Sequence, residues 1–168
     1  MITLIHAGLS QAESETLFKM FEDFNVNEVQ EDLTDEYVSK IHLEIPIAYN
    51  TQIFKNLGLD RWEDLKIILK NIKWRRGNKK FKLTLCFKGN PDVEFSLLTD
   101  SDRILNKALD TIEYQVDNVI LQLKYVQIDN IKSITYRFNT DIYRWVIDNI
   151  IDEKMQVYRY INNRWSKI

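Results

Sequence analysis

The chain has 168 residues, of which 45% are hydrophobic and 29% charged, and its formal net charge is −2. This length and apolar content suit a folded domain with its own core and exclude a disordered tail, and the four glycines and two prolines are too few for a loop-rich sandwich. The single cysteine excludes an intramolecular disulfide, and no apolar run approaches the roughly 20 residues of a membrane span, so we expect a soluble, cytoplasmic protein.

Hydrophobic periodicity and capping residues predict the elements of the first half of the chain. In chain order they are a strand at 1–7, a helix from Ser10 to about 24, a loop or weak strand at 25–36, a half-buried strand at 37–47, a short helix at 51–57 and a helix from Asp60 to about 74.

The second half opens with the clearest strand signal, in which apolar and polar residues alternate on both sides of a turn. The predicted elements are a hairpin of strands at 81–88 and 93–98, a long helix at 101–125, a strand at 131–138, a helix from Asn139 to about 152, a strand at 155–161 and a short final strand containing Trp165.

This order lacks a strict strand–helix alternation, so it favours an α+β fold over a doubly wound one. We expect a mainly antiparallel sheet with helices packed on one face, including the long helix near 101–125. Residues 1–168 form a single domain in this interpretation. The region near 48–60, where the charge balance changes sign, is the one candidate for an internal boundary.

Charge is distributed unevenly along the chain. Residues 1–50 carry ten acidic and two basic side chains, whereas residues 51–168 carry fifteen acidic and twenty-one basic ones. The positive charge peaks at Lys70–Lys82, the basic segment, which holds seven basic residues, two aromatic residues and no acidic one. Such asymmetry indicates either an anionic partner or two regions that neutralise each other.

Basic side chains in this segment are suited to neutralise phosphates, and an indole offers a face for base stacking. The candidate anion or nucleic-acid site therefore comprises Lys73, Trp74, Arg75, Arg76, Lys79, Lys80 and Lys82. Three alternatives stay open: complementing a helix dipole, solubilising a strand face, or pairing with the acidic N-terminal region in the same chain or a neighbouring subunit. The net negative charge of the chain is unusual for a dedicated nucleic-acid-binding domain.

Aromatic and arginine residues interleave near the C-terminus, a composition found in RNA-stacking sheets and in protein interfaces. They are Tyr136, Arg137, Tyr143, Arg144, Tyr158, Arg159, Tyr160, Arg164 and Trp165. No RNP1-like string accompanies them, and ordinary cross-strand packing explains them more simply.

Evidence for catalysis or metal binding is sparse. His6, His42 and Glu44 would complete a metal site only if separate strands aligned them, and no HExxH or HxH motif supports one. Cys86 is best explained as a small, semi-buried strand residue. Phosphate-cradling glycine loops, GxSxG and CxxC motifs are absent.

These observations predict a non-catalytic binding module that engages a polyanion, such as nucleic acid, through the basic segment. The first alternative is a protein–protein interaction module or homo-oligomeric structural protein. The second is an enzyme without a recognisable motif. We expect no cofactor, no metal and no membrane partner.

Overall fold

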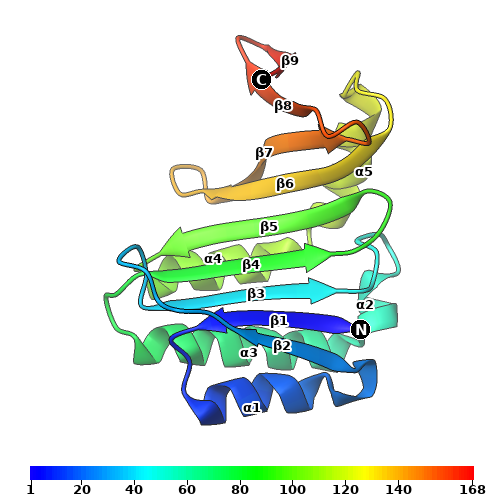
Figure 1. The fold of residues 1–168 in the computed structure, drawn as a ribbon. Coiled ribbons are helices and arrows are strands. Elements are labelled where there is room, and N and C mark those ends of the chain that lie inside the picture. The colour runs from blue at the N-terminus through cyan, green and yellow to red at the C-terminus, as the bar shows by residue number, and fades with distance from the viewer.

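A nine-stranded mixed sheet runs through the molecule in the order β2-β1-β3-β4-β5-β6-β7-β8-β9, seen in a computed structural model that describes residues 1–168 (Figure 1). The strands are β1 (Ile2–Ala7), β2 (Val26–Gln30), β3 (Ser39–Ile45), β4 (Phe81–Phe87), β5 (Asp92–Thr99), β6 (Ile131–Asn139), β7 (Arg144–Asp152), β8 (Val157–Ile161) and β9 (Arg164–Lys167). The helices are α1 (Gln11–Met20), α2 (Ile53–Leu57), α3 (Leu59–Arg75), α4 (Asp102–Ile112) and α5 (Gln115–Tyr125), with a 3-10 turn at Glu22–Phe24.

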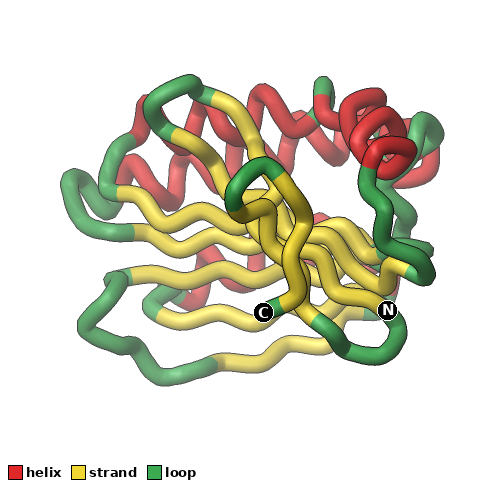
Figure 2. The backbone as a smooth tube through the Cα atoms, turned by 90° about the horizontal axis from the view of Figure 1, so that it is seen from above, coloured by secondary structure: helices red, strands yellow, loops and turns green.

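Three strand–helix–strand units build most of this sheet. The pairs β1/β2, β3/β4 and β5/β6 are parallel, and in each unit the connecting helices cross the same face of the sheet (Figure 2). The other five neighbouring pairs are antiparallel, so the expected α+β fold is confirmed and the sheet is mixed. Parallel neighbours require long crossovers, and here helices supply them.

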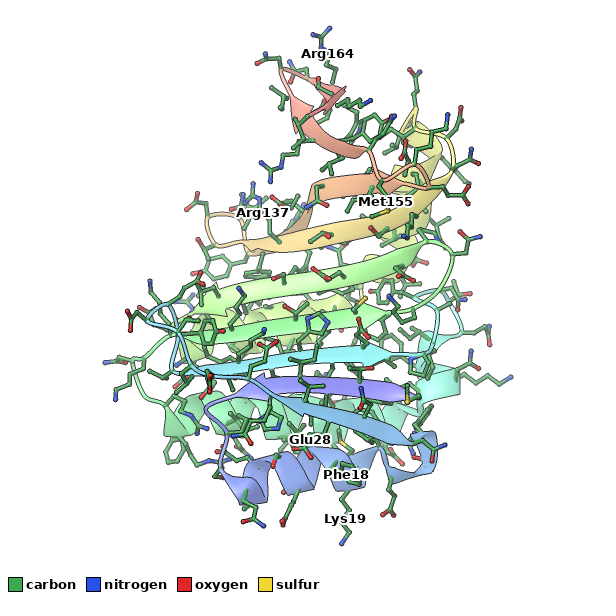
Figure 3. The ribbon with its side chains drawn as sticks, in the orientation of Figure 1. Phe18, Lys19, Glu28, Arg137, Met155 and Arg164 are labelled. Atoms are coloured by element: carbon green, nitrogen blue, oxygen red, sulfur yellow. The ribbon has the colours of Figure 1, made fainter.

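The core lies between the sheet and its helices. Alternation places one apolar row across four strands, in which Leu43 pairs with Leu85, Leu85 with Phe95, and Phe95 with Tyr136. The Trp145 ring meets Phe95 edge-on at 5.1 Å between ring centroids. The opposite face of the sheet carries no helix and presents mainly polar side chains (Figure 3).

The long helix predicted for 101–125 is instead two helices that meet at Glu113–Tyr114. Side chains from other elements bind the groups at this junction. The Tyr49 hydroxyl donates to the Ile112 carbonyl, and the Trp62 indole Nε1 donates to Glu113 Oε1 at 3.1 Å. These tertiary contacts occupy the end of α4 and let α5 take a new direction along the twisted sheet.

The helix predicted for 139–152 is wrong, because this stretch forms the β6–β7 turn and strand β7. Asn139 Oδ1, expected to cap a helix, accepts from the Asp141 and Ile142 amides and closes the turn. Two register shifts in the β6/β7 pairing break strict alternation. The apolar residues of β7 therefore recur at a spacing that resembles a helix.

The region near 48–60 contains α2 and the start of α3, within the crossover from β3 to β4. Its apolar residues Ile53 and Leu57 are buried in the main core. No helix in the structure combines the length and the apolar character needed to cross a membrane.

Candidate functional site

The basic segment covers the last turns of α3, the turn after it and the start of β4. The end of α3, the start of α4 and the β6–β7 turn all lie along one side of the molecule, at the left of Figure 1. The segment is positioned by α3, whose buried face packs against the sheet through Leu65, Leu69 and Ile72. The basic segment therefore lies at the end of a helix that the core holds in place.

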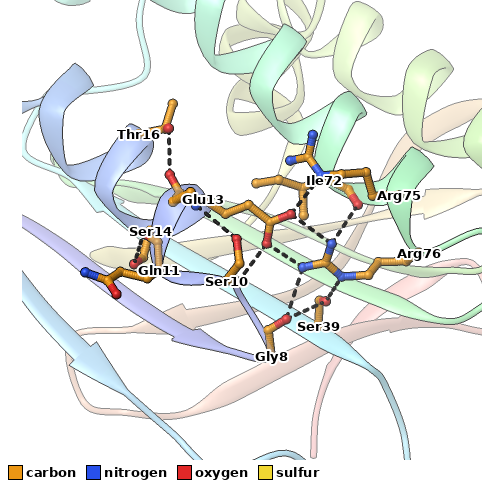
Figure 4. Close-up of polar contacts among 11 residues, drawn as sticks. Gly8, Ser10, Gln11, Glu13, Ser14, Thr16, Ser39, Ile72, Arg75 and Arg76 are labelled. Atoms are coloured by element: carbon orange, nitrogen blue, oxygen red, sulfur yellow. Dashed lines mark hydrogen bonds and ion pairs between the residues drawn. The ribbon is translucent and has the colours of Figure 1, made fainter.

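Glu13 of α1 binds two arginines of this segment (Figure 4). Its Oε1 accepts from Arg75 Nε and Arg76 Nη1, each at 2.9 Å, and its Oε2 accepts from Arg76 Nη2 at 2.6 Å and from the Ser10 amide at 2.9 Å. The Arg76 guanidinium also donates to Ser39 Oγ at 2.6 Å. These donors, led by Arg76, hold the pKa of Glu13 at about 2, below its usual 4.5.

Other members of the segment have internal partners too. Lys73 is fully buried, and its Nζ donates to the Gly77 carbonyl at 2.6 Å and to Asp102 Oδ1 at 3.0 Å. Lys82 Nζ lies 3.9 Å from Glu36 Oε2. The acidic N-terminal region thus pairs within the chain with Arg75, Arg76 and Lys82, which is one of the alternatives that the sequence left open.

Three of the seven predicted site residues face solvent without an acidic partner. Lys79 and Lys80 are exposed and take part in no ion pair, and the Trp74 side chain is exposed to 71% of its full area. Arg75 shares Glu13 with Arg76 but keeps 47% of its side chain exposed. The structure therefore brings Trp74, Arg75, Lys79 and Lys80 to the surface, while Lys73 is inaccessible to any ligand.

A hollow of about 820 Å³ lies between α4 and the β6–β7 turn, elements on the same side of the molecule as the end of α3 (Figure 1). Arg103, Lys107 and Arg144 line it, and the Arg103 guanidinium lies over the Tyr143 ring at 5.5 Å. None of these three cations forms an ion pair. The one lining carboxylate, Asp110, is bound by Lys70 at 2.7 Å.

Sequence reasoning missed this part of the site. Tyr143 and Arg144 belong to the aromatic–arginine set near the C-terminus, whereas Arg103 and Lys107 carried only an i, i+4 spacing on a predicted helix. Only the fold places all four on the same side of the molecule as the end of α3 (Figure 1). We call the combined surface the basic end: Trp74, Arg75, Lys79, Lys80, Arg103, Lys107, Tyr143 and Arg144.

The sheet separates the two histidines. His6 pairs with Ile41 on the helix-covered face, whereas His42, next along β3, points to the opposite face. They cannot share a metal, and the structure contains no group of three or more His, Cys, Asp or Glu side chains suited to hold one. Cys86 is buried, and desolvation raises the pKa of its thiol to about 12, so the reactive thiolate is disfavoured.

Comparisons of the chain with models of known protein families, with curated proteins and with solved structures find no match. The fold and the basic end define an α+β protein with a helix-backed mixed sheet and a concentrated cationic surface.

Proposed function

We propose that this protein is a non-catalytic binding module that holds a polyanion, specifically single-stranded nucleic acid, on the basic end. The observation that supports this function best is the group of five cations with no acidic partner, Lys79, Lys80, Arg103, Lys107 and Arg144, whose elements lie on the same side of the molecule as the exposed Trp74 indole (Figure 1). Cations along a backbone combined with an exposed aromatic ring are the elements of single-strand binding.

Charge neutralisation is the main source of affinity in this proposal. Five lysine and arginine side chains without internal partners can each displace counterions from a phosphate, and these contacts carry no sequence information. Trp74 adds stacking on a base, which the unpaired bases of a single-stranded nucleic acid allow and those of a duplex do not. The net charge of −2 does not oppose this, because local charge governs a surface contact within the screening distance of about 10 Å.

The test is fluorescence anisotropy with labelled single-stranded DNA and RNA, and with the matching duplex, over a range of salt concentrations. We expect the logarithm of the binding constant to fall linearly with the logarithm of the salt concentration. The double variant Lys79→Ala/Lys80→Ala should weaken binding and lower the slope by about 1.4, since each single-strand phosphate contact contributes about 0.7. Trp74→Ala should weaken single-strand binding at every salt concentration by about tenfold or more.

The matched control is Lys19→Ala/Lys55→Ala, which removes two exposed lysines that also form no ion pair, in α1 and α2. It changes the net charge equally but leaves the basic end intact. Equal loss of binding in the two double variants would show that only total charge matters and would refute the site. Absence of binding at low salt would refute the function.

A further inference from the structure

The two outermost strands of the sheet carry opposite charge. Strands β2 and β9 stand at the two ends of the strand order, at the bottom and the top of the sheet in Figure 1. Residues 25–36, which include β2, hold five acidic side chains and no basic one. Residues 154–168, which include β9, hold four basic side chains and no acidic one. One edge of the sheet is therefore acidic and the other is basic.

The outer side of β2 presents backbone groups that no other strand binds. The Asn25 carbonyl and the Glu31 amide both bond to β1. Because alternate residues of a strand bond to the same neighbour, the even-numbered residues between them direct their amides and carbonyls away from β1. These residues are Val26, Glu28 and Gln30.

The outer side of β9 has the same property. The Ile168 amide bonds to the Val157 carbonyl of β8, so the residues of β9 that alternate with Ile168 also bond to β8. Trp165 and Lys167 consequently direct their amides and carbonyls outward. An edge with unpaired backbone groups is a template on which another strand can pair.

Strand direction and sheet faces allow one copy of the chain to continue the sheet of another. Five of the eight neighbouring pairs are antiparallel, so β9 runs opposite to β2. A second copy placed with its helices on the same face therefore brings its β2 antiparallel to the β9 of the first. Glu28 lies beside Leu4, and Lys167 lies beside Tyr158, so both side chains are on the helix-covered face.

The charges of the two edges match in this antiparallel arrangement. Setting the outward-facing residues Glu28 and Lys167 opposite each other lets them exchange backbone hydrogen bonds. The same register sets Glu31 opposite Arg164. Lys167 and Arg164 are exposed and form no ion pair within the chain. Each basic residue of β9 thus meets an acidic residue of the neighbouring copy.

Both carboxylates can accept this second cation. Glu28 uses Oε1 to accept from His6, and Glu31 uses Oε2 to accept from Lys40, so the other oxygen of each has no partner in the chain. The Glu28 side chain is 41% exposed and that of Glu31 is 42% exposed. The contacts within the chain hold each carboxylate in place and leave one oxygen for a neighbour.

We propose that β9 of one copy of this chain pairs with β2 of the next, head to tail, so that the sheet continues from copy to copy. The two surfaces in the contact are different, so the assembly grows into a ring or an open filament and does not close as a dimer. The contact uses no residue of the basic end and does not depend on the proposed function.

The experiment is sedimentation velocity on the full chain, free of nucleic acid, over a range of protein concentrations at low and at high salt. We expect species larger than a dimer that increase with protein concentration. They should weaken at high salt, because salt screens the ion pairs between exposed side chains. A monomer at every concentration, or a dimer that never grows, would overturn the proposal.

Proline variants test which edges meet. Gln30→Pro removes an outward amide of β2, and Lys167→Pro removes one of β9, and neither amide belongs to a hydrogen bond inside the sheet. Each variant alone should stay monomeric. Mixing the two should give a dimer containing one chain of each kind, because each variant retains the edge that the other lacks. A mixture that stays monomeric, or that grows beyond a dimer, would contradict the proposed pairing.

A charge reversal tests the register independently of the prolines. Lys167→Glu should weaken the association by about tenfold, because the cross-strand attraction to Glu28 becomes a repulsion. The matched control is Lys154→Glu, which makes the same change in charge at an exposed lysine between β7 and β8 that forms no ion pair. Far-UV circular dichroism confirms that each variant is folded. Equal weakening by the two reversals would show that total charge, and not this contact, governs the association.

Discussion

The contact between Glu13 and the two arginines allows the free energy of unfolding of a Glu13 variant to be predicted. Replacing Glu13 with glutamine keeps the shape of the side chain but removes the charge that Arg75 and Arg76 share. The difference between a pKa of about 2 in the folded protein and the usual 4.5 is worth roughly 3 kcal/mol at neutral pH. Solvent around the half-exposed Arg75 screens part of this, so we expect a loss of about 2 kcal/mol.

The effect has a defined pH window. Because folding lowers the pKa of Glu13, its stabilisation is fully present above the unfolded value of 4.5 and is lost as the pH falls toward about 2. The native protein should therefore lose stability in this range. The Glu13→Gln variant, which cannot titrate at this position, should lose less, so the gap between the two proteins should narrow.

Urea denaturation followed by tryptophan fluorescence, at pH 7 and again near pH 3, measures both effects. Glu15→Gln is the control, since this neighbouring exposed carboxylate binds only Gln11. A gap between native protein and Glu13→Gln that is the same at both pH values would refute the electrostatic argument. It would then follow that the variant loses stability through packing or through the capping contact with Ser10.

Three further outcomes test separate parts of the fold. Cys86 should resist alkylation at pH 8 in the folded protein and react in urea, because its thiol is buried and has a pKa of about 12; mass spectrometry measures this. Gly8→Ala should cost at least about 2 kcal/mol of unfolding free energy, since Gly8 has a φ of 68° and an added Cβ would lie 2.1 Å from the Val38 carbonyl oxygen. Trp145→Phe should cost about 1–3 kcal/mol in the same assay, because it leaves the buried Ala108 carbonyl without the indole donor at 2.9 Å.

Local patterns predicted those elements whose signals lie within a few residues. The Ser10–Glu13 capping box forms as expected, with Ser10 Oγ accepting from the Glu13 amide at 3.2 Å. The alternating residues around the turn at 89–92 form the predicted β4–β5 hairpin. In both cases the partners are near neighbours along the chain, so the sequence contains the whole interaction.

Local patterns could not predict interactions between segments that lie far apart in the sequence. The break at Glu113 depends on Tyr49 and Trp62, from elements far earlier in the chain. The charge pattern showed a basic segment, but not that Glu13 would bind two of its arginines or that Arg103, Lys107 and Arg144 would lie on the same side of the molecule. A sequence shows which charges a protein has, whereas the fold decides which of them remain available.

The strand order has a consequence for how the chain assembles. From β3 to β9, each strand lies beside the strand that follows it in the sequence. A chain emerging from the ribosome can therefore extend the sheet at a single growing edge, with the partner of each new strand already formed. Loop-closure entropy stays low because the paired segments are close in sequence. Assembly can thus keep pace with synthesis, because each strand from β4 to β9 finds its partner strand already in place.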